Sequence, residues 1–169
     1  MKRLFKTFLV LAVISAPLFE TYCQSDKLND QEKAVMEVVF RLFEGMRQGD
    51  SSMVSSVFIE DVRMYTVFGP DRDNQFKVDN VDGFLKAVGT PHETVWDEPI
   101  WDYTVQIDGN LAHVWTKYAF YAGDKFSHCG VDDFQLVKRG DEWKVFSLAD
   151  TRQYQDCDLP PAGQMERKL

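Results

Sequence analysis

FSHCGVDDFQL, residues 126–136, is the stretch that decides the fold. Its apolar and polar residues alternate as in a β-strand, because successive side chains of a strand point to opposite faces. His128 and Asp132 then share a face with Phe134 and Leu136, and that face must be buried to cover the two apolar side chains. A His and an Asp on a buried face are either hydrogen-bonded structural groups or the polar part of a pocket lining.

The segments around this strand predict an α+β domain. Apolar residues at helical spacing predict a long helix from Asn29 to Gly49, a short helix after Asp50, and a third helix that ends at Gly89. A turn-rich loop is expected at residues 69–74, and Pro99 indicates an edge or bulge in a long strand. The predicted strands are residues 62–68, 94–107, 111–121, 126–138 and 143–154. Three N-terminal helices packed on one face of a strongly curved, mostly antiparallel sheet would enclose a conical cavity.

Residues 1–23 have the pattern of a secretory signal peptide. A basic start is followed by a short apolar run at residues 8–16 and by small residues before Gln24. The run is too short to span a bilayer as a stable helix. We therefore expect a secreted or periplasmic protein that starts at Gln24 and has no stable membrane insertion after cleavage.

The composition fits one folded domain, residues 24–157, followed by a flexible tail, residues 158–169. The hydrophobic fraction of 44% and the aromatic fraction of 14% exclude a disordered chain. Removal of residues 1–23 takes away three basic residues and one acid, and so moves the net charge from −8 to −10. Such an acidic protein repels phosphate backbones, and no nucleic-acid partner is expected.

Two cysteines, Cys129 and Cys157, remain after cleavage. Export to an oxidising compartment would allow a disulfide between them. The sequence does not show whether the two residues approach within bonding distance, so the bridge stays an open question at this point.

Several short stretches resemble one known superfamily. They are Gly49-Asp50, Phe58 with Asp61, LAHVW at 111–115, HCGVD at 128–132, and WKV at 143–145 before DTR at 150–152. Over residues 28–155 the chain resembles the nuclear transport factor 2-like superfamily, closest to its polyketide-cyclase (SnoaL)-like and "putative lumazine-binding" branches of small exported bacterial proteins. The resemblance implies a cone-shaped fold, an open-ended pocket and a homodimer formed through the outer sheet face. Enzymes of this superfamily use Asp, His or Tyr for proton transfer, but no motif of one enzyme matches this chain residue by residue.

The lining of the expected pocket depends on one hairpin register. A three-residue loop at residues 123–125 places Thr116 opposite Asp132 and Phe120 opposite His128. A loop of two or four residues places Trp115 opposite Asp132 instead, because a one-residue slip exchanges the two faces. The first register is favoured, since its face is more apolar, and it brings Tyr118 into the pocket as a hydroxyl donor.

Asp132 is the candidate general base, because burial of a carboxylate in an apolar cone raises its pKa. His128 is a candidate donor, although it lies about 13 Å along the strand from Asp132 at about 3.3 Å per residue. The alternative is a structural carboxylate paired with Arg152. The candidate ligand contacts are Tyr65, Trp101, Thr116, Tyr118, Phe120, Asp150 and Arg152. Arg152 could bind a ligand carboxylate or form an ion pair with Asp132 or Asp102, and Trp101 fits the core or a dimer contact better than a ligand platform.

No cofactor and no metal ion are expected. The three His residues have no ligand spacing, and the chain carries neither a Gly-rich phosphate loop nor a nucleophile elbow. The leading hypothesis is a protein that binds a small hydrophobic or aromatic ligand. The alternatives are an acid–base enzyme of isomerisation, dehydration or cyclisation, and an interaction module whose cone is filled by its own side chains.

Overall fold

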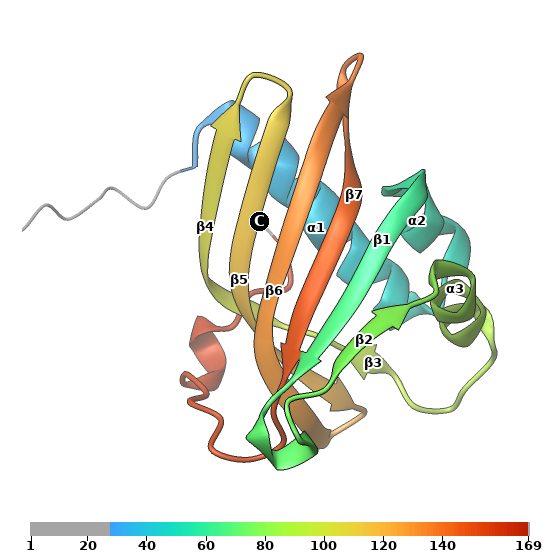
Figure 1. Cartoon of the computed structure of the whole chain (residues 1–169), viewed down its shortest axis with the longest axis vertical. Coiled ribbons are helices and arrows are strands. Elements are labelled where there is room, and N and C mark those ends of the chain that lie inside the picture. Colours follow the sequence, from blue (N-terminus) through green and yellow to red (C-terminus); the bar gives the residue numbers. More distant parts are fainter. Residues whose placement is uncertain (1–27, 169) are drawn as a thin grey trace, which may run out of the picture.

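A computed structural model describes residues 28–168, and Figure 1 shows a long curved sheet with helix α1 lying across one face. The described part contains three α-helices, seven strands and two short 3₁₀ helices, η1 and η2. The predicted signal peptide lies outside the described residues.

The helices begin and end where the sequence predicts. Helix α1 spans Asp30–Gln48, and its first turn is closed by a capping box in which Asn29 accepts from the backbone of Glu32 while the Glu32 carboxylate accepts from the backbone of Asn29. Gly49 ends α1 with a φ of 68°, a left-handed conformation that glycine adopts without strain. Helix α2 covers Ser51–Ser56 and helix α3 covers Val81–Gly89.

The seven strands form one sheet in the order β2-β1-β7-β6-β5-β3, with β4 also paired to β5. The strands are β1 Phe58–Phe68, β2 Phe76–Asp79, β3 Trp96–Asp97, β4 Ile100–Asp108, β5 Leu111–Ala122, β6 Lys125–Arg139 and β7 Glu142–Arg152. Only β1 and β7 run parallel among the described pairs, so the prediction of a mostly antiparallel sheet is confirmed.

Two parts of the sheet differ from the sequence prediction. The segment after the turn-rich loop forms the edge strand β2, which the sequence analysis missed because its residues are mostly exposed. The long strand predicted over residues 94–107 is two strands, β3 and β4, separated at Glu98 and Pro99. Pro99 lacks the N–H that a continuous ladder needs, and the chain bends there.

The core lies between α1 and the concave face of the sheet. Phe43 of α1 meets Phe134 of β6 edge to face, with 6.0 Å between ring centroids. Phe134 and Leu136 are fully buried, as the alternation of residues 126–136 requires. The face that carries His128 and Asp132 is therefore the one turned toward the helices.

The C-terminal segment, predicted as a flexible tail, is attached to the sheet at several points. Cys129 and Cys157 form a disulfide with 6.1 Å between their Cα atoms, which answers the question that the sequence left open. Backbone hydrogen bonds of 3.0 and 2.7 Å join Glu166 to Ile100, and Arg167 forms an ion pair with Asp97. The segment thus packs beside the corner between β3 and β4.

Candidate functional site

The β5–β6 hairpin has the favoured register, but for a different reason. Thr116 faces Asp132 and Phe120 faces His128, as predicted. The loop is the two-residue turn Gly123–Asp124, not three residues, and a bulge between Phe120 and Tyr121 accommodates one additional residue, Ser127, on β6. The two-residue turn alone would have exchanged the two faces of β6, and the bulge returns His128 and Asp132 to the face predicted for them.

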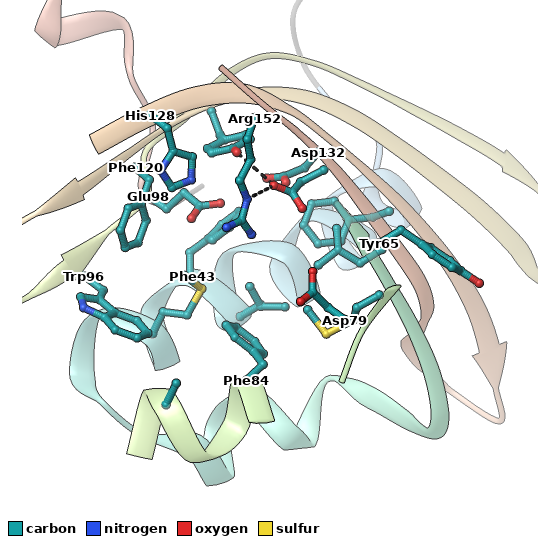
Figure 2. A pocket seen from close by; sticks show the side chains of 18 of the residues that line it. Phe43, Tyr65, Asp79, Phe84, Trp96, Glu98, Phe120, His128, Asp132 and Arg152 are labelled. Atoms are coloured by element: carbon teal, nitrogen blue, oxygen red, sulfur yellow. Dashed lines mark hydrogen bonds and ion pairs between the residues drawn. The ribbon is translucent and has the colours of Figure 1, made fainter. Parts of the chain in front are cut away.

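A cavity of about 600 Å³ opens between the sheet, α1 and α3 (Figure 2). Aromatic and aliphatic side chains form most of its wall, and polar groups gather where β5, β6 and β7 lie side by side. The apolar part consists of Leu42, Phe43, Met46, Met64, Phe84, Trp96, Phe120, Phe134 and Leu148, and the polar part includes Asp79, Glu98, Tyr118, His128, Asp132, Asp150 and Arg152. The cone is therefore open, and side chains do not fill it as the interaction-module hypothesis requires.

Seven of the nine candidate residues line this cavity: Tyr65, Tyr118, Phe120, His128, Asp132, Asp150 and Arg152. Tyr65 stands at the rim, where its ring stacks on Phe76 at 5.6 Å and points away from the polar cluster (Figure 2). The structure brings neither Thr116 nor Trp101 to the wall. Thr116 is fully buried and its hydroxyl lies 3.2 Å from the Trp101 carbonyl oxygen, where β4 bulges after Trp101. The Thr116 hydroxyl thus satisfies a backbone carbonyl group beside the bulge.

Asp132 has a partner that the sequence analysis missed. Its side chain lies close enough to that of Glu98, the residue before Pro99, for the two carboxyl groups to interact, and such a pair can form a hydrogen bond only when it holds a proton. Asp132 is 3% exposed, and its Oδ2 atom receives no bond from an N–H or hydroxyl group within residues 28–168. One proton can be shared between the two carboxyl groups, and the Asp132 Oδ2 atom still lacks an N–H or hydroxyl donor.

Both carboxyl groups bind protons more tightly than usual. Burial, followed by the charge of Asp150, raises the pKa of Glu98 to about 8. Burial, followed by the charge of Glu98, raises the pKa of Asp132 well above its ordinary range. Glu98 keeps partial exposure, but it lines the cavity and so faces the enclosed space. The pair therefore retains at least one proton at neutral pH.

Arg152 pairs with Asp150 and not with Asp132 or Asp102. Arg152 Nε lies 2.5 Å from Asp150 Oδ2, whereas Asp102 forms its ion pair with Lys117. Thr66 Oγ1 lies 2.6 Å from the other Asp150 oxygen, and the Tyr118 hydroxyl donates to the carboxylate at 3.2 Å. The predicted structural ion pair of Arg152 exists, but its partner is its own strand neighbour.

His128 is neutral in this environment. Burial, followed by the positive charge of Arg152, lowers the pKa of His128 to about 4. Its ring lies among Tyr118, Phe120 and Tyr154, with centroid distances of 5.8, 5.1 and 5.6 Å. His128 therefore belongs to the aromatic wall and does not act as a cation at neutral pH.

Burial, followed by the charge of Asp132, raises the pKa of Tyr118, so its hydroxyl stays protonated. Besides Asp150, this hydroxyl lies 2.9 Å from the Thr151 carbonyl oxygen. The site thus holds one hydroxyl donor, a carboxyl pair with a retained proton and one guanidinium group.

The sequence contained a weak signal for Glu98. A carboxylate directly before a strand-breaking proline, two residues after Trp96, lies at a corner where side chains can turn inward. The sequence did not show that this corner brings the Glu98 side chain across β5 to Asp132 on β6.

No group of His, Cys, Asp and Glu residues within residues 28–168 has an arrangement that could hold a metal ion. Within the same residues, no helix is both long enough and apolar enough to cross a bilayer.

Residues 30–149 match one family model, which is described as "Putative lumazine-binding". A search of curated proteins found no match. Among solved structures, a nuclear transport factor 2-like protein of unknown function from Shewanella baltica is similar at 19% identity, with a TM-score of 0.57, over 75% of this chain and 98% of that one. A structure titled putative scytalone dehydratase, from Novosphingobium aromaticivorans, has 15% identity and a TM-score of 0.59, over 80% of this chain and 95% of that one. A nuclear transport factor 2-like protein from Cytophaga hutchinsonii has 11% identity and a TM-score of 0.58, over 75% of this chain and all of that one. At these identities the structural neighbours show the fold alone.

Proposed function

Because the chain belongs to the "Putative lumazine-binding" family and has the nuclear transport factor 2-like fold, we propose that its cavity binds a small hydrophobic or aromatic molecule. The observation that carries the proposal is the open cavity of about 600 Å³ with apolar walls and a few polar groups at one end. Ligand pockets of proteins have this size and this division of surface.

The walls favour a flat ligand. Trp96 meets Phe120 edge to face at 6.0 Å, and Phe120 lies at 5.1 Å from His128, so three rings adjoin along one side. Phe84 of α3 and Phe43 of α1 lie across the space (Figure 2). Lumazine, which the family description names, is a flat two-ring heterocycle with polar edges, and this class of molecule suits such a wall.

A cavity-filling variant tests the proposal. Gly83 lines the cavity, and a Cβ atom there would meet only the Asn80 Cβ at 4.0 Å, so Gly83→Trp adds bulk at the cavity without backbone strain. Gly163→Trp is the matched control, because Gly163 lies in the C-terminal segment with nothing within 4 Å of an added Cβ. In calorimetric titrations with 2-naphthol, wild type and Gly163→Trp should bind, and Gly83→Trp should not. Equal binding by both variants would refute a ligand site in this cavity.

Acid–base catalysis is the second candidate function, and the Glu98–Asp132 pair is the observation that favours it. A carboxyl pair that retains a proton near neutral pH can both give and accept one. Asp132→Asn would then lower turnover of a substrate by roughly 10² to 10⁴-fold with the fold intact. Turnover that survives Asp132→Asn would remove this candidate.

Export and dimerisation complete the proposal. The pattern of residues 1–23 supports export, and the Cys129–Cys157 disulfide suits an oxidising compartment. Leu111 and Trp115 are 53% and 46% exposed on β5, and exposed apolar side chains grouped on one strand support contact with a second copy of the chain.

A further inference from the structure

Two carboxyl groups at the cavity have no cation as a partner. Lys77 pairs with Asp79 and Arg152 pairs with Asp150, so each cation that lines the cavity already has a carboxylate partner. Glu98 and Asp132 remain, and within residues 28–168 no Lys, Arg or His forms an ion pair with either of them. Arg152 attracts both carboxyl groups only at longer range.

The unpaired carboxyl groups lie inside the cavity and not on the outer surface. Asp132 is 97% buried, since its exposure is 3%, and it lines the cavity with an oxygen that lacks an N–H or hydroxyl partner in the described part of the chain. Trp96, Phe120 and Glu98 lie on the same side of the space (Figure 2). A buried acceptor without a donor is costly, and a ligand that supplies the donor removes that cost.

We propose that the ligand is an aromatic molecule with a cationic nitrogen group, such as an amidinium, whose two N–H donors bind Glu98 and Asp132. This inference rests on the proposed function, because it assigns the chemistry of the ligand in the same cavity. The flat ring lies against Trp96 and Phe120, and the nitrogen group reaches the carboxyl pair beyond them. Charge-assisted N–H···O bonds to two carboxylates are among the strongest that a protein offers.

Binding of such a cation to two carboxylates requires the carboxyl pair to release each proton that it retains. No bond other than the O–H bond breaks, and the proton passes to the solvent. The other titratable or charged groups that line the cavity are Tyr65, Asp79, Asp150, Lys77, Arg152, Tyr118 and His128. Because the two ion pairs are neutral as units and His128 is uncharged, the carboxyl pair decides the sign of the ligand.

Arg152 suggests the opposite ligand, a carboxylate, which the sequence analysis considered. Three carboxyl groups, Glu98, Asp132 and Asp150, share the neighbourhood of this one guanidinium group. An anion would have to compete with Asp150 for Arg152 and would lie beside the carboxyl pair. The repulsion favours a cation at this end of the cavity.

Three probes with one ring system test the charge. The purified protein is titrated at pH 7.5 with 2-naphthamidine, 2-naphthamide and 2-naphthoate, which carry a cation, a neutral amide and an anion on the same naphthalene. The amidine should bind at least about tenfold more tightly than the amide, and the anion most weakly. Titration in buffers of different ionisation enthalpy should show that the amidine releases protons and the amide does not.

Variants locate the preference. Asp132→Asn should reduce the amidine preference to less than about threefold while amide binding persists, because the amide side chain keeps the shape and removes the charge. Asp133→Asn is the matched control, since Asp133 is paired with His113 and does not line the cavity. Glu98→Gln gives the same readout from the other carboxyl group if Asp132→Asn does not fold.

The outcomes separate the two proposals. If the amide or the naphthoate binds as tightly as the amidine, and Gly83→Trp still abolishes binding, the cation preference is refuted and the cavity site stands. If none of the three probes binds, or if Gly83→Trp leaves their binding unchanged, both proposals fail. A preference for the amidine that Asp132→Asn and Glu98→Gln leave intact would also refute the assignment to this pair.

Discussion

Glu98→Gln should stabilise the protein increasingly as the pH rises. The pKa of Glu98 is about 8 in the fold against an ordinary value of 4.5, because burial disfavours its charged form. Between these values the folded protein holds a proton that the unfolded chain has lost, so raising the pH lowers the free energy of unfolding of the wild type. Glutamine keeps the size and the hydrogen-bond donor of the protonated carboxyl group and cannot ionise.

The size of the effect follows from the two pKa values of Glu98. Each pH unit between them contributes about 1.4 kcal/mol. The stability difference between variant and wild type should therefore grow from near zero at pH 4.5 to an upper bound of roughly 5 kcal/mol near pH 8. His128, with a pKa lowered from 6.5 to about 4, makes both proteins more stable as the pH rises from 4 to 6.5. This contribution is common to both proteins and cancels in the difference.

Urea denaturation at half-unit steps from pH 5 to pH 8.5, followed by tryptophan fluorescence, measures the difference directly. Glu93→Gln is the control, since Glu93 is exposed on the same segment and its replacement should shift stability by less than about 0.5 kcal/mol at every pH. Parallel stability profiles of Glu98→Gln and wild type would show that Glu98 is not held protonated. The inference that Glu98 and Asp132 retain a proton at neutral pH would then be refuted.

Four further outcomes are expected. Cys157→Ser should lower the free energy of unfolding by about 3–4 kcal/mol, because the lost disulfide closes a loop across a separation of 28 residues; equal urea midpoints for the oxidised wild type and the variant would contradict this. Gly130→Ala should cost about 3 kcal/mol or prevent folding, since its Cβ would lie 1.9 Å from the Thr151 carbonyl oxygen, and a melting temperature within a degree of wild type would refute the close approach. Light scattering at tens of micromolar should give the mass of a dimer that Trp115→Glu converts to monomer, whereas a monomeric wild type would remove the proposed contact. The intact mass of exported protein should begin at Gln24, and exported material that retains residues 1–23 would disprove cleavage.

The sequence predicted those features that depend on local pattern. The capping box at Asn29 and the left-handed cap at Gly49 need only a few neighbouring residues, and both are present. The alternation of residues 126–136 placed His128 and Asp132 on the buried face, because burial of Phe134 leaves no other choice.

Features that depend on distant segments were beyond the sequence. Glu98 lies between β3 and β4, which pair with β5, and β5 in turn pairs with β6, where Asp132 lies. The approach of Glu98 to Asp132 therefore depends on how these separate segments pair. The positions of β-bulges could not be predicted from the sequence either. On β7 the register shifts between Val145 and Ser147, so that Val145 and Leu148 are both buried although they are three positions apart. A bulge changes the phase of a strand without leaving a distinct sequence pattern.

The bulge at Ser127 affects the shape of the cavity wall but not which residues form it. The pairs on either side of it, Phe120 with His128 and Tyr121 with Phe126, would become consecutive rungs of a regular ladder if Ser127 were deleted. Such a deletion would leave the turn and every paired side chain in place, but it would remove the local bend and additional twist that a bulge gives a strand. Natural or engineered length changes at this one position would therefore alter the width of the cone near Phe120 and His128 while keeping the chemical groups that line it.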